Sequence, residues 1–452
     1  MTPPNRCTMT APLDLPLQYQ ARLIARGAIS AVELTQAALD RISARDGISR
    51  AVVDLNAGAL ALAREIDEMP AEQRPPLAGL AFGVKDIIDV AGQPTRCGSH
   101  THDASPAQDA TAVARLRQAG MIPLAKLATY EYALTGPAWD QPNPPARNPW
   151  NPDHITGGSS SGSAAAVAAG MMRVALGTDT GGSIRAPAAY CGIVGLKPTH
   201  GLVPDAGCFP LSPSLDVIGP LAGCVADAAL VLDAIAPGAG AMRKIGQDIK
   251  GMKIAYGRDW FADDPRCDPA LLQGLDDTCA ALSLLGAQIH LTPLPAYDRL
   301  EAAGTVILQA EALTTHRTPL SQNYDKYGVD ARRNLLTGAV PDDADIARAR
   351  QIGLEFRAAV DVIFADHAAI LLPTTLGPAP AFADFADGPV WTAMRTLPFN
   401  LSGHPALSLP CGLAANGLPL GCQLVTRHKD EATLCQIGHA LEQAVLPLPR
   451  PL

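Results

Sequence analysis

Short apolar runs alternate with helical segments along the chain from about Leu77 onward. The run over residues 80–84 is short, apolar and ends directly at Lys85-Asp86, which is typical of a buried strand. Further runs and helical segments follow in alternation, at residues 110–119, 121–125, 164–170 and 174–176. This alternation is typical of an α/β protein with a buried sheet. We therefore expect a central mixed β-sheet covered on both faces by α-helices.

The chain of 452 residues has no break in composition that would mark a linker, so we predict a single large domain. Its parts are expected to be a helical N-terminal segment, a catalytic core, a variable helical region and a C-terminal return to the sheet, over residues 13–70, 77–235, 236–366 and 367–452. In the first part, Ser30 and Glu33 have the spacing of a helix capping box. Other helices are predicted at 225–236, 267–285 and 298–360, and other strands at 370–373 and 407–410.

Composition excludes several classes of protein. Hydrophobic residues make up 48% and charged residues 17%, which gives a globular chain enough apolar material for a core. The net charge is −9 and no run of Lys or Arg could follow a phosphate backbone, so nucleic acid is not an expected partner. The ten cysteines include no C-x-x-C pair, so neither a disulfide framework nor a zinc site is expected.

No segment has the pattern of an export signal or a membrane span. The first twenty residues lack a basic stretch followed by an apolar one. The longest run of small apolar residues, 164–176, is too short to cross a bilayer and contains Arg173. We therefore expect a cytoplasmic protein that does not associate with membranes.

Two segments rich in glycine and serine lie close together in the sequence. They are Thr156-Gly-Gly-Ser159-Ser160-Ser161-Gly-Ser163 and Gly177-Thr-Asp179-Thr180-Gly181-Gly182-Ser183-Ile-Arg185. Residues 162–170 as a helix advance about 13 Å, and residues 173–177 as a strand return about 16 Å. The two serine-containing loops can therefore meet.

The glycines and a nearby lysine favour nucleophilic chemistry. Glycine permits backbone conformations in which several N–H groups converge on one oxyanion, and the loop from Thr180 to Ser183 could form such a nest. A serine nucleophile needs a base, and no histidine stands beside either loop. Lys85 can serve if desolvation lowers its pKa. The alternatives are a plain turn for the glycines and a surface position for the lysine.

Together these motifs resemble those of the amidase signature family. The resemblance rests on three motifs in order, Gly83-Val-Lys85-Asp86, Gly157-Gly-Ser-Ser-Ser-Gly-Ser163 and Gly181-Gly-Ser-Ile-Arg-Ala-Pro187. It extends to Asn148-Pro149-Trp150 and to Gly192-Ile-Val-Gly-Leu-Lys-Pro198, and it is clear over residues 77–235. Three separated motifs in one order make the resemblance specific.

The resemblance implies an amidase signature fold and a catalytic triad of serine, cis-serine and lysine. The family nucleophile corresponds to Ser183 and the family lysine to Lys85. The relay serine, which a cis peptide holds in the family, corresponds to Ser159. The implied reaction is hydrolysis of a carbon–nitrogen bond through an acyl-enzyme on Ser183.

The remaining site residues are also implied by the resemblance. The backbone N–H groups of the nucleophile loop are expected to form the oxyanion hole, at Thr180, Gly181, Gly182 and Ser183. Three further residues match family positions and are expected to support the loop, namely Ser160, Asp179 and Arg185. Four residues are expected to line the acyl pocket, namely Tyr130, Ala133, Phe209 and Leu211.

The expected substrate is a small neutral molecule with a carboxamide, anilide or carbamate (urethane) bond, rather than a peptide. Few aromatic residues and no arginine cluster favour this neutral substrate. No cofactor is implied, and a monomer or homodimer is expected. An alternative function is that of the A-type component of the tRNA-dependent glutamine amidotransferase, which uses the same chemistry together with a partner subunit. The third alternative, a non-catalytic scaffold, would have lost a triad residue, and none is lost here.

Three other patterns are weaker. Gly158-Ser-Ser160-Ser-Gly162 fits a nucleophile elbow, with His404 as one downstream base, but no apolar strand precedes Ser160. His100-Thr-His102-Asp103 could hold a metal, but no second cluster completes it, so no metal site is expected. Cys191 has no evident basic partner and is expected to pack in the core.

Overall fold

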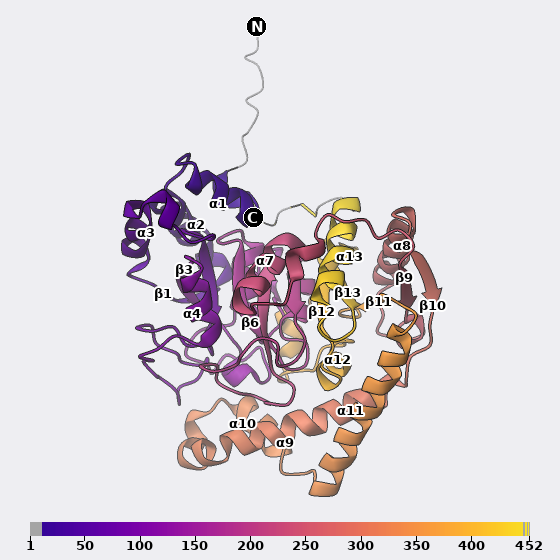
Figure 1. Ribbon diagram of the computed structural model, residues 1–452. Coiled ribbons are helices and arrows are strands. Elements are labelled where there is room, and N and C mark those ends of the chain that lie inside the picture. The colour runs from indigo at the N-terminus through magenta and orange to yellow at the C-terminus, as the bar shows by residue number, and fades with distance from the viewer. Residues whose placement is uncertain (1–10, 446–447, 450, 452) are drawn as a thin grey trace.

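The computed structural model describes residues 11–445, 448, 449 and 451. Within that part of the chain, eleven strands form one mixed sheet in the order β1-β3-β2-β6-β8-β7-β12-β13-β11-β9-β10 (Figure 1). The strands are β1 (Val52–Leu55), β2 (Ala81–Lys85), β3 (Ile122–Leu127), β6 (Val174–Asp179), β7 (Val194–Lys197), β8 (Val217–Ala222), β9 (Lys253–Tyr256), β10 (Gln288–Leu291), β11 (Ala369–Pro373), β12 (Ala406–Leu413) and β13 (Pro419–Val425). A separate hairpin pairs β4 (Arg147–Asn148) with β5 (Asn151–Ile155).

The central strands decide where the site lies. Strand β2 pairs in parallel with both β3 and β6, and every residue of these three strands is buried. Strands buried on both faces read as continuous apolar runs, which is why these short segments were visible in the sequence. The carboxyl ends of parallel strands lie at one edge of a sheet. Lys85 at the end of β2 and Asp179 at the end of β6 therefore lie on the same side.

Helices cover both faces of the sheet, so the predicted α/β fold with a covered mixed sheet is confirmed. On one face α5 packs beside α6, and on the other α7 packs beside α13. The helices are α1 (Leu17–Ala25), α2 (Ala31–Ser49), α3 (Ala59–Glu68), α4 (Thr111–Gln118), α5 (Ser161–Ala168), α6 (Arg185–Cys191), α7 (Val225–Ile235), α8 (Pro269–Leu284), α9 (Tyr297–Asn323), α10 (Val329–Thr337), α11 (Asp343–Phe364), α12 (Leu397–Leu401) and α13 (Glu431–Ala444).

A helical insertion lies across one end of the sheet. Helices α9, α10 and α11 run along the bottom of the view in Figure 1, where α9 packs against both of the others. They correspond to the helical insertion predicted at 298–360. The wider region 236–366 is not wholly helical, because it also contributes β9 and β10 to one edge of the sheet. The N-terminal segment 13–70 likewise contributes β1 to the other edge.

Local signals in the sequence correspond to observed contacts. The capping box of α2 is present, with the Ser30 amide donating to Glu33 at 2.8 Å and the Glu33 amide donating to Ser30 Oγ at 2.9 Å. Five elements of the sheet layers were not predicted from the sequence, namely β7, β8, β13, α6 and α13. These elements lack a distinctive turn or periodic signal of their own and are defined by packing.

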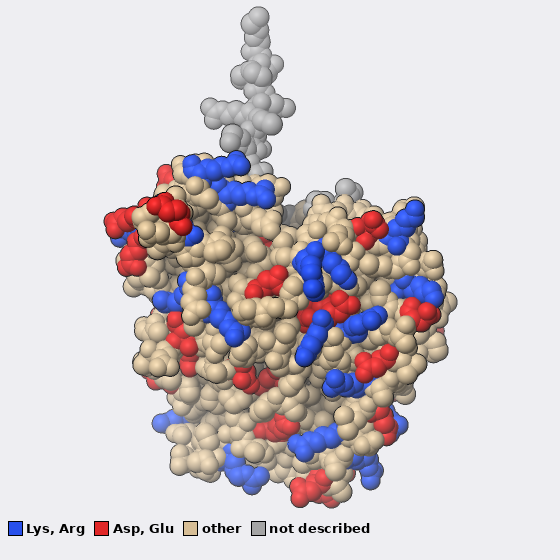
Figure 2. Space-filling view, viewed as in Figure 1, with Lys and Arg blue, Asp and Glu red and all other residues tan. Residues whose placement is uncertain are grey.

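The surface and the helices agree with the composition. Figure 2 shows acidic and basic side chains interspersed over the face in view. In the described residues, the structure contains no helix that is both long and apolar enough to cross a membrane. The nine cysteines described are free thiols, and Cys7 lies outside the described residues.

Close packing of α8 on β12 gives a test of the fold. A Cβ atom added at Gly274 in α8 would lie 2.6 Å from the carbonyl oxygen of Cys411, whereas one added at the exposed Gly47 in α2 would meet nothing within 4 Å. We expect Gly274→Ala to lower the free energy of unfolding by about 1–3 kcal/mol, because the backbone must move. Gly47→Ala should raise it by up to ~1 kcal/mol, because alanine favours helix. Thermal unfolding of the two variants measures both signs, and a stable Gly274→Ala would contradict the packing.

Candidate active site

Lys85 is buried at the carboxyl end of β2, with a side chain that is 0% exposed. Its Nζ donates to Ser159 Oγ at 2.7 Å and to Thr178 Oγ1 at 2.7 Å. Burial lowers the pKa of Lys85 to about 7, although nearby acidic groups, including Asp216, act to raise it. A lysine with such a pKa is partly neutral near neutral pH and can accept a proton.

Ser159 lies in the loop between β5 and α5, and the Gly158–Ser159 peptide is cis. The Ser159 carbonyl accepts from the Tyr130 amide at 3.2 Å, which fixes the loop on the segment after β3. Gly158 must be a glycine, because a Cβ atom there would lie 2.2 Å from the Tyr130 ring. This packing holds the Ser159 hydroxyl against Lys85.

Ser183 lies in the loop between β6 and α6 and is partly exposed. The two glycine-rich loops meet, since the Ser160 amide donates to the Ser183 carbonyl at 3.3 Å. Ser160 Oγ is held between the loops as well, donating to the Thr178 carbonyl at 3.1 Å. Ser159 and Ser183 line the same inner cavity of about 60 Å³. The structure thus brings together the three residues that the motifs predicted, with Ser183 facing the cavity.

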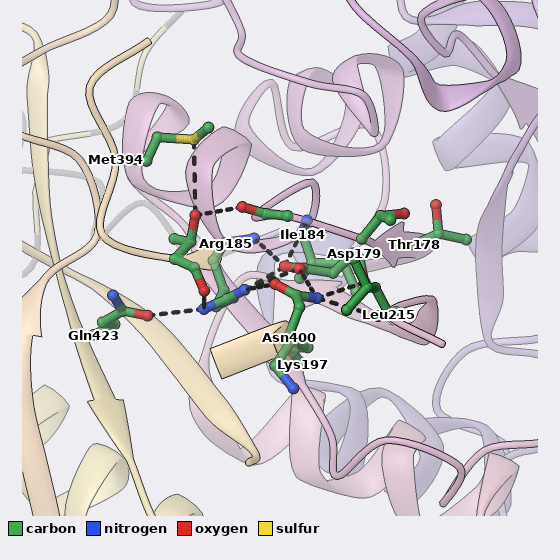
Figure 3. A network of polar contacts seen from close by, with 12 residues as sticks. Thr178, Asp179, Ile184, Arg185, Lys197, Leu215, Met394, Asn400 and Gln423 are labelled. Carbon is green, nitrogen blue, oxygen red and sulfur yellow. Dashed lines mark hydrogen bonds and ion pairs between the residues drawn. The ribbon is translucent and has the colours of Figure 1, made fainter. Parts of the chain in front are cut away.

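A buried ion pair anchors the Ser183 loop from behind (Figure 3). Arg185 donates from Nε and Nη2 to the two carboxylate oxygens of Asp179, at 3.0 and 2.9 Å. The other guanidinium contacts are to Asn400 Oδ1 at 2.6 Å and to Gln423 Oε1 at 3.0 Å. Both charged side chains are 0% exposed. Burial acts to raise the pKa of Asp179, but the adjoining Arg185 outweighs it and lowers the pKa to about 2.

Thr396 fixes the loop from the opposite side. Its hydroxyl donates to the Gly181 carbonyl at 2.6 Å. Gly182 has φ of +139°, and a Cβ atom there would lie 2.3 Å from Thr396 Oγ1, so only glycine fits. In the described part of the chain, the amides of Gly181, Gly182 and Ser183 have no hydrogen-bond acceptor. Unpaired N–H groups beside a serine hydroxyl suit a developing oxyanion.

A larger cavity of about 920 Å³ opens outward from Ser183 towards α9 and α10. Three of the four residues expected in the acyl pocket line the cavities at Ser183. Ala133 and Leu211 line the outer cavity, and Tyr130 lines the inner one. Phe209 does not line either. It lines a side cavity of about 150 Å³ and packs with its ring centroid 4.9 Å from that of Tyr132.

Several residues that shape the site were not predicted from the sequence. Thr178 lies within the second glycine-rich segment, but its contact with Lys85 had no signal there. Thr396, Asn400 and Gln423 come from the C-terminal part of the chain, and Trp391 covers Gly181 from the same part. A residue that supports a site from more than 200 positions away leaves no local pattern.

The weaker patterns are placed elsewhere. Ser160 is fully buried and its hydroxyl is engaged by Thr178, so it is not free to act as an exposed nucleophile. His404 contacts Ser402 and Asp361 rather than Ser160. Cys191 is buried, and burial raises the pKa of its thiol, so a thiolate is disfavoured.

The histidine-rich segment near residue 100 has its own contacts. His102 packs its ring 5.3 Å from the Phe209 ring, and Asp103 pairs with Arg96 at 3.4 Å. Among the residues that the structure describes, neither His100, His102 nor Asp103 belongs to a group of three that could hold a metal.

A serine–lysine site on a mixed sheet between helix layers defines a class of hydrolase, and comparison with known proteins gives the family. The Amidase family model matches residues 33–435, so this chain belongs to the Amidase family, whose members act on carbon–nitrogen bonds. The chain is 37% identical to the A-type component of the Glutamyl-tRNA(Gln) amidotransferase of Exiguobacterium sibiricum, over 93% of this chain and 95% of that protein.

Solved structures agree with this assignment. One neighbour is a chain of a vestigial protein complex that reveals the evolutionary origins of an s-triazine catabolic enzyme; it is 31% identical with a TM-score of 0.88, covering 96% of this chain and 100% of that chain. Another is the peptide amidase from Stenotrophomonas maltophilia, 29% identical with a TM-score of 0.82, covering 97% and 98% of the two chains. The predicted membership of the amidase signature family is confirmed.

The lowered pKa of Lys85 gives a pH prediction. If neutral Lys85 is the base, kcat/KM on a non-titrating amide should rise as the pH increases through about 7 and then level off, because protonated lysine accepts no proton. Thr178→Val is the matched variant. It removes a hydroxyl that stabilises the ammonium form, so the pH limb should move down by up to about one unit. A rate that stays flat as the pH falls well below that value would contradict the assignment of the base.

Proposed function

We propose that this chain hydrolyses an amide-type bond through an acyl-enzyme on Ser183. The observation that carries the proposal is the hydrogen bond between buried Lys85 and Ser159, in a loop that meets the loop of Ser183. Neutral Lys85 takes the proton of Ser183 by way of Ser159, and Ser183 Oγ attacks the carbonyl carbon. The N–H groups of Gly181, Gly182 and Ser183 stabilise the oxyanion.

The second half of the cycle uses the same groups in reverse. Ammonium Lys85 returns its proton through Ser159 to the leaving nitrogen, the carbon–nitrogen bond breaks, and the acyl group stays on Ser183. Water then attacks the ester, giving up a proton along the same route, and the acid leaves. Asp179 and Arg185 do not touch the reacting atoms in this scheme, but hold the loop in the conformation that presents the donors.

The first candidate substrate is a small neutral amide, anilide or carbamate that is hydrolysed by the chain alone. It is supported by the apolar character of the inner cavity, where Tyr130, Tyr190 and Met394 surround the two serines. Trp391 extends this surface and is half exposed, so it can contact a substrate at the mouth. An uncharged acyl group gains from burial against such side chains. A non-peptide substrate and a cytoplasmic location are parts of this proposal.

The second candidate is glutamine hydrolysis as the A-type component of an amidotransferase, with the ammonia passed to a partner. The curated relatives favour it over the first candidate, because those with the printed name of that component match 93% or more of this chain at up to 37% identity. The outer cavity supports it too. Its charged lining includes Arg333 and Asp330 of α10 and Glu301 of α9, which suits a substrate with both an ammonium and a carboxylate.

The proposed nucleophile can be tested with a panel of amide, anilide, ester, carbamate and urea substrates. Ser183→Ala and Lys85→Ala should each lower kcat by at least about a thousand-fold, because each removes a group required for acylation. Ser161→Ala is the matched control. Ser161 lies in the same segment, but its hydroxyl donates to the Ala128 carbonyl at 3.2 Å, so activity should be largely retained. Full activity in Ser183→Ala would disprove the proposal.

Glutamine separates the two candidates. The second predicts glutaminase activity that increases with a co-purified partner, and a KM for glutamine raised about ten-fold by Arg333→Ala, because a charge-assisted contact to the carboxylate is lost. The KM for a neutral anilide should not change in that variant. Efficient hydrolysis of neutral amides by the isolated chain, with no turnover of glutamine, would favour the first candidate.

A further inference from the structure

Three metal-ligand side chains converge on the side of the sheet's C-terminal half, from segments far apart in the sequence. Asp361 belongs to α11, His404 precedes β12, and His428 follows β13. One ligand atom from each lies within 4.8 Å of the other two. None of the three residues lines the cavities at Ser183. The cluster is therefore separate from the proposed amide chemistry.

Hydrogen bonds from Ser402 orient both imidazole rings. The Ser402 carbonyl accepts from His428 Nε2 at 2.9 Å, which fixes that nitrogen as the N–H and leaves Nδ1 with its lone pair. The Ser402 hydroxyl contacts His404 Nδ1 at 2.9 Å, and His404 Nε2 lies 3.2 Å from Asp361 Oδ1. Metal-binding histidines usually have one ring nitrogen held in this way by a carbonyl or hydroxyl group.

The setting favours neutral imidazoles and leaves an access route. His404 is fully buried and its ring lies 3.9 Å from that of His428. Burial, assisted by His428 and the nearby cations Lys197 and Arg357, lowers the pKa of His404 to about 2, so the ring is not an imidazolium near neutral pH. A metal binds the neutral ring. The carboxylate of Asp361 is 52% exposed, which opens the cluster to solvent.

We propose that Asp361, His404 and His428 form a binding site for a divalent transition-metal cation of the zinc type. Two imidazoles and one carboxylate are ligands that such ions accept, with water completing the shell. Lys197 and Arg357 oppose binding by charge, and the Asp361 carboxylate offsets them. In the metal-free protein the His404–Asp361 hydrogen bond takes the place of the metal. The bound ion would tie the end of α11, which packs on α9, to the loops flanking β12 and β13.

The full-length chain, stripped with EDTA and titrated with ZnSO₄ against a chelating dye, tests the site. We expect one equivalent of Zn²⁺ per chain and a higher unfolding temperature when it is bound. Asp361→Asn and His428→Ala should each weaken the affinity at least ten-fold and abolish the rise in unfolding temperature. His367→Ala is the matched control, because His367 follows α11 closely and contacts His290 at 3.1 Å in a separate pair.

The outcomes are distinct. Zinc binding retained in His367→Ala and weakened in both site variants supports the site. Zinc binding that is equal in all three variants, or lost only in His367→Ala, would overturn the proposal, as would an unsubstituted chain that binds no more zinc than Asp361→Asn. Circular dichroism identifies the variants that fold, and the exposed Asp361→Asn keeps the test decisive if His428→Ala does not fold.

Discussion

The buried ion pair between Asp179 and Arg185 is the interaction on which the rest of the site depends. It joins the end of β6 to the start of α6, and so spans the loop that carries Ser183. A fully buried pair is costly to desolvate and is strongly destabilising when one partner is removed. Here the cost is offset by the amides of Ile184 and Arg185 and by Asn400, all of which donate to Asp179, and by Gln423, which accepts from Arg185. The charges therefore specify one loop conformation.

The second constraint is the desolvation of Lys85. A lysine at the end of a central parallel strand has no room to reach water, and its neighbours here are hydroxyls rather than a carboxylate in direct contact. Lys126 on the adjacent strand gives the contrast, since it is equally buried but lies 2.9 Å from Asp86. Two buried lysines on neighbouring strands thus differ in their partners: one has a counter-ion in direct contact, and the other, which has none, can lose its proton. This difference separates a structural lysine from a candidate base.

Much of the fold and part of the site could be predicted from the sequence. Strands β2, β3 and β6 are short apolar runs buried on both faces, and their pattern is local, so they were predicted close to their observed bounds. The glycine-rich loops, Lys85, Ser159 and Ser183 were identified from motifs, and the structure brings them together. Strands β9 and β10 were missed because an edge strand with exposed positions has no continuous apolar run. Phe209 was expected beside the substrate, but it fills a separate aromatic cluster, since an apolar residue near a site carries no mark of the side it faces.

The sequence by itself determined the family, the order of the motifs and the identity of the residues that carry the proposed chemistry, because these depend on residue type and short spacing. Only the tertiary structure decided the burial of Lys85, the orientation of Ser159 towards it and the support of the loop by Thr396, Asn400 and Gln423. These last three are separated from Arg185 by 211, 215 and 238 positions. Burial and pKa depend on every neighbour in space. They are therefore set by how the C-terminal strands return to the sheet, which no local pattern encodes.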